Sequence, residues 1–243
     1  PKKSPLINSP AKPMIPWKKL GIAQIPNNGG ELQLSQRGEE FSIRLSGVRG
    51  ELMNSRIYNS EQVLAELGCA LIKEKSDAHV LVGGLGMGYT LAATLQAVAA
   101  SAQVTVAELI PEVVEWNKGP LGDCAQNPLR DPRTKVVLGD VAELLENQHE
   151  QYDAILLDVD NGPEGLTHTD NNWLYSQRGL ESISRTLRPE GMLAIWSAGA
   201  DSMFAIRLKK ARFKVSIHTV RARPGKGSRH TIFLAQKPWR ASE

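Results

Sequence analysis

The sequence has few of the features that mark a secreted or membrane-bound protein. Only two cysteines, Cys69 and Cys124, occur in 243 residues, which excludes a disulfide framework and fits a reducing compartment. No apolar run reaches the roughly 18 residues that a bilayer span needs. Residues 1–5 contain no apolar signal-peptide core. We therefore expect a cytoplasmic protein.

Several catalytic and partner classes are also missing. No cluster of cysteine and histidine has the spacing of a metal site, and there is neither a G-x-S-x-G motif nor a P-loop. The net charge of +3 is too small to argue for nucleic-acid binding by itself. We therefore expect no metal ion, no membrane association and no nucleic-acid partner. The 41% apolar content is ordinary for a globular protein.

A glycine-rich loop is the first informative feature. The apolar run 79–82 stops at the loop 83–88, and residues 89–100 read as a helix rich in Ala, Leu and Thr. A strand, a glycine turn and a helix open a nucleotide-binding βαβ unit, in which glycines let the backbone approach the ligand. Tyr89 breaks the dinucleotide pattern G-x-G-x-x-G. The loop instead reads G-x-G-x-G, the usual form in class I methyltransferase-like proteins; the alternative is a tight turn without a ligand.

The next two predicted strands each lead into an acidic residue. The run 103–107 ends at Glu108, whose carboxylate can accept hydrogen bonds from both ribose hydroxyls. The run 135–138 ends at Gly139-Asp140, and this aspartate can accept from an adenine amino group. Either acid alone is more often a helix N-cap, but the ordered set predicts a pocket for an adenosyl sulfonium compound. The predicted cofactor-binding residues are Gly83, Gly84, Leu85, Gly86, Met87, Gly88, Glu108, Leu109, Asp140, Val141 and Asp158.

The fourth predicted strand, 152–157, leads into the stretch 158–163, Asp-Val-Asp-Asn-Gly-Pro. Here the chain resembles the spermidine synthases, the polyamine aminopropyltransferases. Their glycine loop is similar to residues 82–91, and their two strand-end acids match Glu108 and Asp140. Their D-x-x-D-P-x-G-P stretch is similar to 158–163, which is shorter here. The resemblance covers residues 52–237.

The resemblance implies an α/β fold of the class I AdoMet-dependent methyltransferase-like superfamily. We expect a mostly parallel, Rossmann-like seven-stranded sheet with helices on both faces, preceded by a small antiparallel β region. It also implies a transferase that binds S-adenosylmethionine (AdoMet), decarboxylated AdoMet or methylthioadenosine and moves an aminopropyl-type alkyl group to a small-molecule amine. By the same resemblance, Asp158 would deprotonate the amine and Asp160 would help to hold it. We expect a homodimer.

Three departures from the family bear on substrate choice. Met87 stands where the family has an aspartate that would repel the carboxylate of AdoMet. Asn59-Ser60 replaces a Tyr-Gln or Tyr-His pair before a glutamate, here Glu61. A Tyr-Pro-Ser-Gly loop is replaced by the basic stretch 223–227. An arginine-rich rim suits an acidic acceptor group. The predicted acceptor-binding residues are Arg221, Arg223, Arg229, Trp173 and Tyr175.

Two alternatives to an aminopropyltransferase therefore stay open. The first is an AdoMet-dependent methyltransferase or aminocarboxypropyltransferase with an acidic or zwitterionic acceptor. The second is a non-catalytic homologue that keeps the cofactor pocket. Trp173 and Tyr175 have their own alternative, because either aromatic ring can pack the following helix instead of lining a pocket.

The chain divides into three predicted parts. Residues 1–19, rich in Pro and Lys, are expected to be a flexible arm. Residues 20–56 alternate in apolar character and predict a β-hairpin region. Residues 57–243 predict the cofactor-binding domain, because strands and helices alternate after a helix at 60–73. The last two strands, 215–220 and 231–235, are expected to close the sheet as an antiparallel pair.

Overall fold

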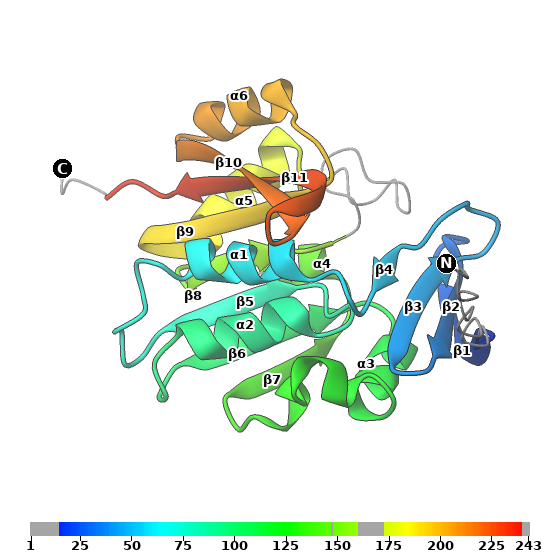
Figure 1. The fold of residues 1–243 in the computed structure, drawn as a ribbon. Coiled ribbons are helices and arrows are strands. Elements are labelled where there is room, and N and C mark those ends of the chain that lie inside the picture. The colour runs from blue at the N-terminus through cyan, green and yellow to red at the C-terminus, as the bar shows by residue number, and fades with distance from the viewer. Residues whose placement is uncertain (1–14, 147, 160–172, 240–243) are drawn as a thin grey trace, which may run out of the picture.

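The protein is described here by a computed structural model that covers residues 15–146, 148–159 and 173–239. Within these residues the strands form two sheets (Figure 1). The antiparallel N-terminal sheet has the order β1(Lys18–Ile25), β2(Gly30–Arg37), β3(Glu40–Leu45), β4(Met53–Asn54). The main sheet has the order β10(Lys214–Arg223), β11(Lys226–Gln236), β9(Leu187–Ser197), β8(Tyr152–Leu157), β5(His79–Gly83), β6(Gln103–Glu108), β7(Thr134–Leu138).

The main sheet has the expected methyltransferase-like arrangement. Strand β5 pairs in parallel with both β6 and β8, and β7 and β9 extend this parallel block on either side. Strand β11 pairs antiparallel with β9 and with β10, so the predicted closing pair is confirmed. Because the parallel strands run the same way, their carboxyl ends meet at one edge of the sheet, where open α/β sheets bind ligands.

The helices cover both faces of this sheet (Figure 1). They are α1(Asn59–Gly68), α2(Tyr89–Ala97), α3(Pro111–Lys118), α4(Val141–Glu146), α5(Gln177–Thr186) and α6(Ser202–Lys210), with short 3-10 turns at η1(Gly122–Ala125) and η2(Pro128–Arg130). The predicted helix 60–73 therefore stops early, and residues 69–74 continue as turns. No helix in the described part of the chain has the length and apolarity to cross a bilayer.

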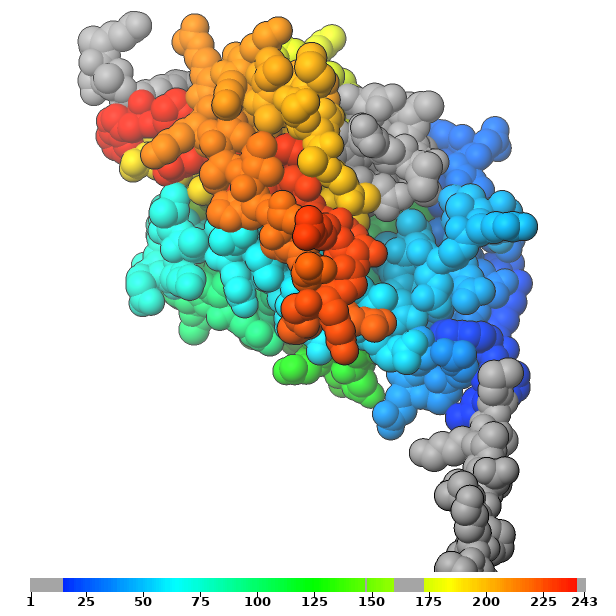
Figure 2. Space-filling view, turned by 45° about the horizontal axis from the view of Figure 1, so that its top comes forward, coloured from blue at the N-terminus to red at the C-terminus, as the bar shows by residue number. Residues whose placement is uncertain are grey.

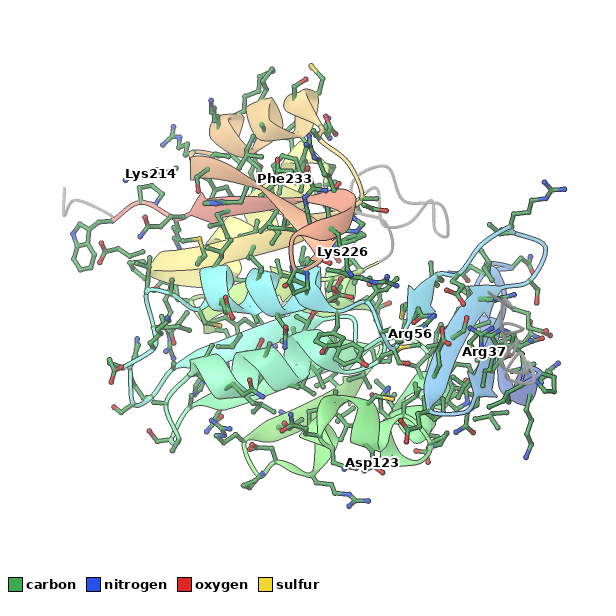
Figure 3. All side chains as sticks on the ribbon, in the orientation of Figure 1. Arg37, Arg56, Asp123, Lys214, Lys226 and Phe233 are labelled. Carbon is green, nitrogen blue, oxygen red and sulfur yellow. The ribbon has the colours of Figure 1, made fainter. Side chains whose placement is uncertain are left out.

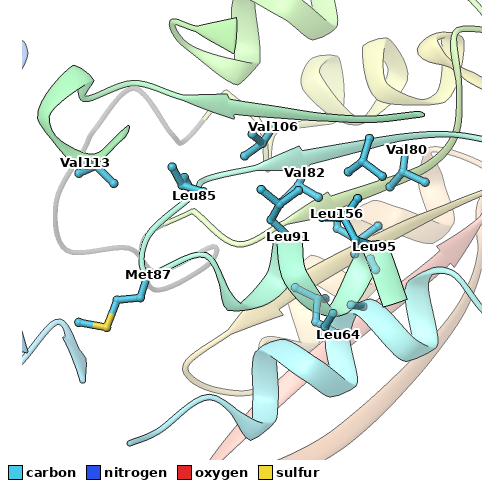
Figure 4. Close-up of a cluster of buried hydrophobic side chains, with 14 of the residues drawn as sticks. Leu64, Val80, Val82, Leu85, Met87, Leu91, Leu95, Val106, Val113 and Leu156 are labelled. Carbon is cyan, nitrogen blue, oxygen red and sulfur yellow. The ribbon is translucent and has the colours of Figure 1, made fainter. Parts of the chain in front are cut away.

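Two apolar cores lie on opposite faces of the sheet. The first contains side chains from α1, α2 and α3, among them Leu64 and Leu91, and extends into the N-terminal sheet; Figure 4 shows part of it. The second contains side chains from α4, α5 and α6. In this second core Phe204 meets Phe233 of β11 edge to face, with ring centroids 5.1 Å apart. Phe233 is labelled in Figure 3.

The N-terminal sheet follows from alternating apolar and polar residues in its strands and from the turn between β1 and β2. Leu32 and Leu34 of β2 and Ile43 of β3 are buried on the same face. Asn27 and Asn28 take positive φ angles of 56° and 60° between β1 and β2, a conformation that asparagine tolerates better than most residues. The antiparallel β region predicted ahead of the main domain is therefore confirmed.

The C-terminal hairpin of β10 and β11 lies against α1 (Figure 2). The side-chain amide of Asn59 donates a hydrogen bond of 2.7 Å to the carbonyl oxygen of Arg221. This contact joins the start of α1 to the hairpin although 162 residues separate the two positions. The hairpin and α1 thereby become neighbouring walls of the space above the sheet edge.

A buried aspartate links the starts of β5, β8 and β9, at the edge of the sheet opposite the carboxyl ends of the parallel strands. Asp153 in β8 is 5% exposed, and its carboxylate forms ion pairs with Lys75 at 2.8 Å and Arg188 at 2.7 Å. The same carboxylate accepts a hydrogen bond of 2.8 Å from the backbone N–H of His79 at the start of β5. Since every carboxylate oxygen has a partner, the charge stabilises the sheet instead of straining it.

We expect Asp153→Asn to lower the free energy of unfolding by about 1–3 kcal/mol, because the variant removes a buried charge and leaves its donors poorly paired. Lys75 and Arg188 are partly exposed and can be hydrated, which favours the lower end of this range. Urea unfolding of the variant and parent measures the difference. Glu115→Gln, which breaks the exposed pair with Lys118, is the control and should change stability by less than about 0.5 kcal/mol. Equal effects of the two substitutions would contradict this role of Asp153.

Candidate active site

The glycine loop between β5 and α2 requires glycine for two reasons. Gly84, Gly86 and Gly88 all have positive φ angles, of 90°, 51° and 84°. A Cβ atom on Gly84 would also lie 2.4 Å from the carbonyl oxygen of Asp158. The loop can therefore pass directly over the end of β8 only because no side chain separates them.

Glu108 holds this loop from the neighbouring strand. Its carboxylate is almost fully buried and accepts hydrogen bonds of 2.9 Å from the backbone N–H groups of Leu85 and Ile110. Burial raises the pKa of Glu108, and these N–H donors oppose the rise. The Glu108 carboxylate thus meets the backbone of the glycine loop, and Glu108 also lines the pocket described below.

Asp140 has the capping role that its sequence position allows. Its carboxylate accepts a hydrogen bond of 2.8 Å from the backbone N–H of Ala142 in the first turn of α4. The same residue lines the pocket beside Gly139. The helix-capping and ligand-facing interpretations of Asp140 are thus compatible.

These groups surround a pocket at the carboxyl edge of the sheet, which we call the glycine-loop pocket. Its main-domain residues are Gly84, Gly86, Ala107, Glu108, Leu109, Ile110, Val113, Gly139, Asp140, Val141, Asp158 and Val159. Its remaining wall is apolar and comes from the N-terminal sheet and the segment leading to β4: Ile25, Leu32, Ile43, Leu52 and Met53. Most of the main-domain residues of this pocket are among the predicted cofactor-binding residues. The sequence pattern assigned no role to the apolar wall from the N-terminal sheet.

Four predicted cofactor residues lie outside this pocket. Gly83 is the last residue of β5, and Gly88 caps the N-terminus of α2. Leu85 and Met87 line a second cavity instead. Figure 4 shows the Met87 side chain directed away from Leu91 and Leu95 of the apolar core, and it is 4% exposed.

The second space, which we call the acid-lined cavity, has a volume of about 430 Å³, within the range of small-molecule sites. It shares four residues with the glycine-loop pocket, namely Leu52, Met53, Gly86 and Asp158, so the two spaces adjoin. Its other lining residues are Glu51, Asn54, Ile57, Ser60, Glu61, Leu85, Met87, Tyr89, Thr90, Trp196, Ala198, Ala222, Ser228 and His230.

Two half-buried carboxylates face this cavity from different elements. Asp158 follows β8 and accepts a hydrogen bond of 2.6 Å from the hydroxyl of Thr90; burial raises its pKa, and this hydrogen bond opposes the rise. Glu61 lies in the first turn of α1 and accepts 2.7 Å from the hydroxyl of Ser60. Burial first, and then the negative charge of Asp158, raise the pKa of Glu61 to about 7. None of the described residues that line the cavity is a lysine or an arginine.

An aromatic pair forms another part of the wall. The rings of Trp196 on β9 and His230 on β11 lie 4.7 Å apart at an angle of 34°. Burial lowers the pKa of His230, so its ring is neutral near pH 7. Neither residue is among the predicted site residues. The signal for Trp196 was its position at the carboxyl end of a parallel strand, where ligands of such sheets bind.

The predicted acceptor-binding arginines do not line the cavity. Arg221 and Arg229 face each other across β10 and β11 and are exposed. Their neighbours Ala222, Ser228 and His230 line the cavity, and successive strand residues point to opposite faces. Arg223, beyond an irregularity in the strand pairing, is not a lining residue either.

The two predicted aromatic acceptor residues pack elsewhere. Tyr175 is 4% exposed and meets Phe204 edge to face, with ring centroids 5.5 Å apart in the second core. Trp173 packs against the same core. The packing interpretation therefore describes both. Asp160, the predicted partner of Asp158, lies outside the described residues.

Comparison with known proteins gives a consistent picture. A model of the spermine/spermidine synthase domain matches residues 60–214. A polyamine aminopropyltransferase of Korarchaeum cryptofilum is 28% identical over 191 residues, which are 74% of this chain and 56% of that protein. Polyamine aminopropyltransferase 2 of Hyperthermus butylicus is 31% identical over 121 residues, 50% of this chain and 38% of that protein. The chain thus spans about half, or less, of the length of these curated relatives.

The fold agrees as well. The crystal structure of spermidine synthase from Thermotoga maritima superimposes with a TM-score of 0.70 at 17% identity, covering 91% of this chain and 74% of that one. At this identity the likeness concerns the fold alone. The family match includes α1, the glycine loop, Glu108, Asp140 and Asp158 and extends well over half of the sequence. The chain therefore belongs to the spermine/spermidine synthase domain family.

Proposed function

We propose that the chain is a transferase that moves an aminopropyl group from decarboxylated AdoMet to an amine. The observation that carries this proposal is the position of Asp158. Its carboxylate lies where the glycine-loop pocket meets the acid-lined cavity. A donor bound in the first space and an acceptor bound in the second would meet at this residue. The family and the names of the curated relatives support the same reaction.

Each part of the site has a separate task in this proposal. Glu108 and Asp140 would hold the ribose and adenine of the donor, beside the backbone of the glycine loop. The donor supplies an electrophilic methylene carbon next to its sulfonium. Asp158 would attract the protonated amine and accept its proton, because an amine is a nucleophile only after losing that proton. Positioning of the two substrates supplies the rest.

The charge of the second cavity favours a cationic acceptor over an acidic one. Glu51, Glu61 and Asp158 line it, and its described lining residues include no lysine or arginine. A negative acceptor group would meet carboxylates there and would lie on the opposite side of the hairpin from Arg221 and Arg229. The methyltransferase and aminocarboxypropyltransferase alternatives with acidic acceptors, and the non-catalytic alternative, are accordingly not favoured. Cytoplasmic location and a homodimer stay predictions.

The donor pocket can be tested by binding alone. We expect Glu108→Ala to weaken methylthioadenosine binding by about 1.5–3 kcal/mol, the scale of hydrogen bonds to a charged group. Isothermal titration calorimetry measures the affinity, and thermal unfolding checks that the loss of the Leu85 and Ile110 contacts has not unfolded the protein. Glu112→Ala, at an exposed position in the first turn of α3, should bind like the parent. Unchanged affinity of the Glu108 variant would place the ribose elsewhere.

Donor choice can be tested at Met87. We expect Met87→Asp to weaken AdoMet binding relative to binding of the decarboxylated form, because a carboxylate at about 4 Å from that of AdoMet costs roughly 1–4 kcal/mol. The ratio of the two dissociation constants should change by about tenfold or more. Met87→Asn, polar but uncharged, is the control and should leave the ratio near that of the parent. A ratio that does not move in the aspartate variant would show that residue 87 is remote from the amino-acid end of the donor.

The chemical role of Asp158 can be separated from binding. We expect Asp158→Asn to slow single-turnover transfer about 100-fold or more, because asparagine keeps the shape and the Thr90 contact but cannot accept the proton. Methylthioadenosine affinity should stay within about threefold of the parent value. Rapid-quench measurement uses the amine that the parent consumes fastest. Transfer at the parental rate would remove Asp158 from the chemistry.

A further inference from the structure

Glu61 is a second carboxylate in the acid-lined cavity, and the reaction described above gives it no task. It projects from the first turn of α1, whereas Asp158 approaches from the end of β8. Ser60, which donates to Glu61, is 2% exposed. Within the described residues neither carboxylate has an ion pair with a lysine or arginine. Both carboxylates are half-buried, and carboxylates withdrawn from water are normally paired with a cation. A ligand can supply the cation that this pair lacks.

The other titratable groups around Glu61 do not supply that cation. Glu51 precedes β4, and its carboxylate forms an ion pair of 3.4 Å with Arg44 of β3, so that arginine is already engaged by another acid. Tyr89 on α2 donates its hydroxyl to the carbonyl oxygen of Ser55 at 2.7 Å, and burial raises the pKa of this phenol. His230 on β11 is kept neutral near pH 7 by burial. The residues that line the cavity therefore carry a net negative charge above about pH 7.

We propose that Glu61 and Asp158 act as a carboxylate pair that binds the protonated amine of the acceptor and receives its proton. The proposal rests on the transferase function inferred above. It makes Glu61 a residue that contacts the acceptor, and it defines the acceptor end as a primary ammonium group. Two carboxylates can accept two of its three N–H groups at once.

The atoms and charges of this step balance. One ammonium proton passes to a carboxylate oxygen of the pair, and the nitrogen lone pair then forms a bond to the methylene carbon of the donor. The carbon–sulfur bond breaks, and its electrons stay on sulfur, which becomes a neutral thioether. The product nitrogen is a secondary ammonium. The proton on the pair leaves to solvent when the products depart.

A pair serves this step better than a single carboxylate. When one carboxyl group has taken the proton, the other remains ionised and faces the positive charge of the product nitrogen. A single buried aspartate would be neutral at that moment and would leave the cation without a partner in a medium of low dielectric constant. Glu61 thus keeps the charge of the site balanced on both sides of the transfer.

The pair makes acceptor binding depend on pH in a defined direction. Because the pKa of Glu61 is raised to about 7, the residue is protonated below that pH and ionised above it. As pH falls through 7, the cavity loses one negative charge and should bind an ammonium group less tightly. The alkylammonium ligand stays protonated over the same interval, since its own pKa is near that of lysine, about 10.

The test is calorimetric titration of 1,4-diaminobutane into protein saturated with methylthioadenosine, from about pH 6 to about pH 8.5. We expect the parent affinity to rise about tenfold over this interval, the effect of one added charge contact. Glu61→Gln should bind about tenfold more weakly at the upper end and should show little dependence on pH. Glu66→Gln, an exposed position on the same helix, is the matched control and should follow the parent.

A second measurement separates an acceptor-contacting role from a structural one. The pH profile of single-turnover transfer should show an acid limb near pH 7 in the parent and in Glu66→Gln, and this limb should be absent in Glu61→Gln. If Glu61→Gln matches the parent in both measurements, the pair is refuted and the transferase function stands. If the parent binds methylthioadenosine but no diamine at any pH, the amine-transferase function is refuted with it.

Discussion

The close passage of the glycine loop over the end of β8 is the constraint on which both ligand spaces depend. Gly84 donates its N–H to the carbonyl oxygen of Ala107 at 2.9 Å, and Asp158 donates to Gly83 at 2.9 Å. These bonds join β5, β6 and β8 at the height of the ligand. A side chain at position 84 would push Asp158 away from the loop. The position of the Asp158 backbone is therefore coupled to that of the glycine loop.

The N-terminal sheet is part of this arrangement. Met53 pairs with Ile43 across β3 and β4, and its sulfur would lie 3.0 Å from a Cβ atom placed on Gly86. Leu52 and Met53 line both spaces. A glycine at position 86 thus allows the antiparallel sheet to close over the loop. The N-terminal β region, which the sequence pattern separates from the main domain, therefore forms part of the wall of both spaces.

The sequence predicts the parts of the site that depend on local pattern. Glycines after β5 and acids after β6, β7 and β8 are found because parallel strands end at one edge of a sheet. Glu61, Trp196 and His230 come from α1, β9 and β11, and their meeting depends on how the C-terminal hairpin lies over α1. No spacing rule encodes that contact. The predicted acceptor-binding arginines do not line the acid-lined cavity. The sequence pattern does not give the face of each strand residue, and Arg221 and Ala222 point to opposite faces.

Asp153 and Asp158, at the two ends of β8, show how one residue type serves structure and function in different settings. Asp153 is buried and Asp158 is half-buried. Asp153 meets two cations and a backbone N–H, so its charge is satisfied in the folded chain. Asp158 meets a threonine hydroxyl and the negative charge of Glu61, and no described residue supplies a cation. The second arrangement raises the free energy of the empty site. In the proposed reaction an ammonium ligand would relieve that cost on binding, and part of the specificity for amines would then come from repulsion already present in the protein.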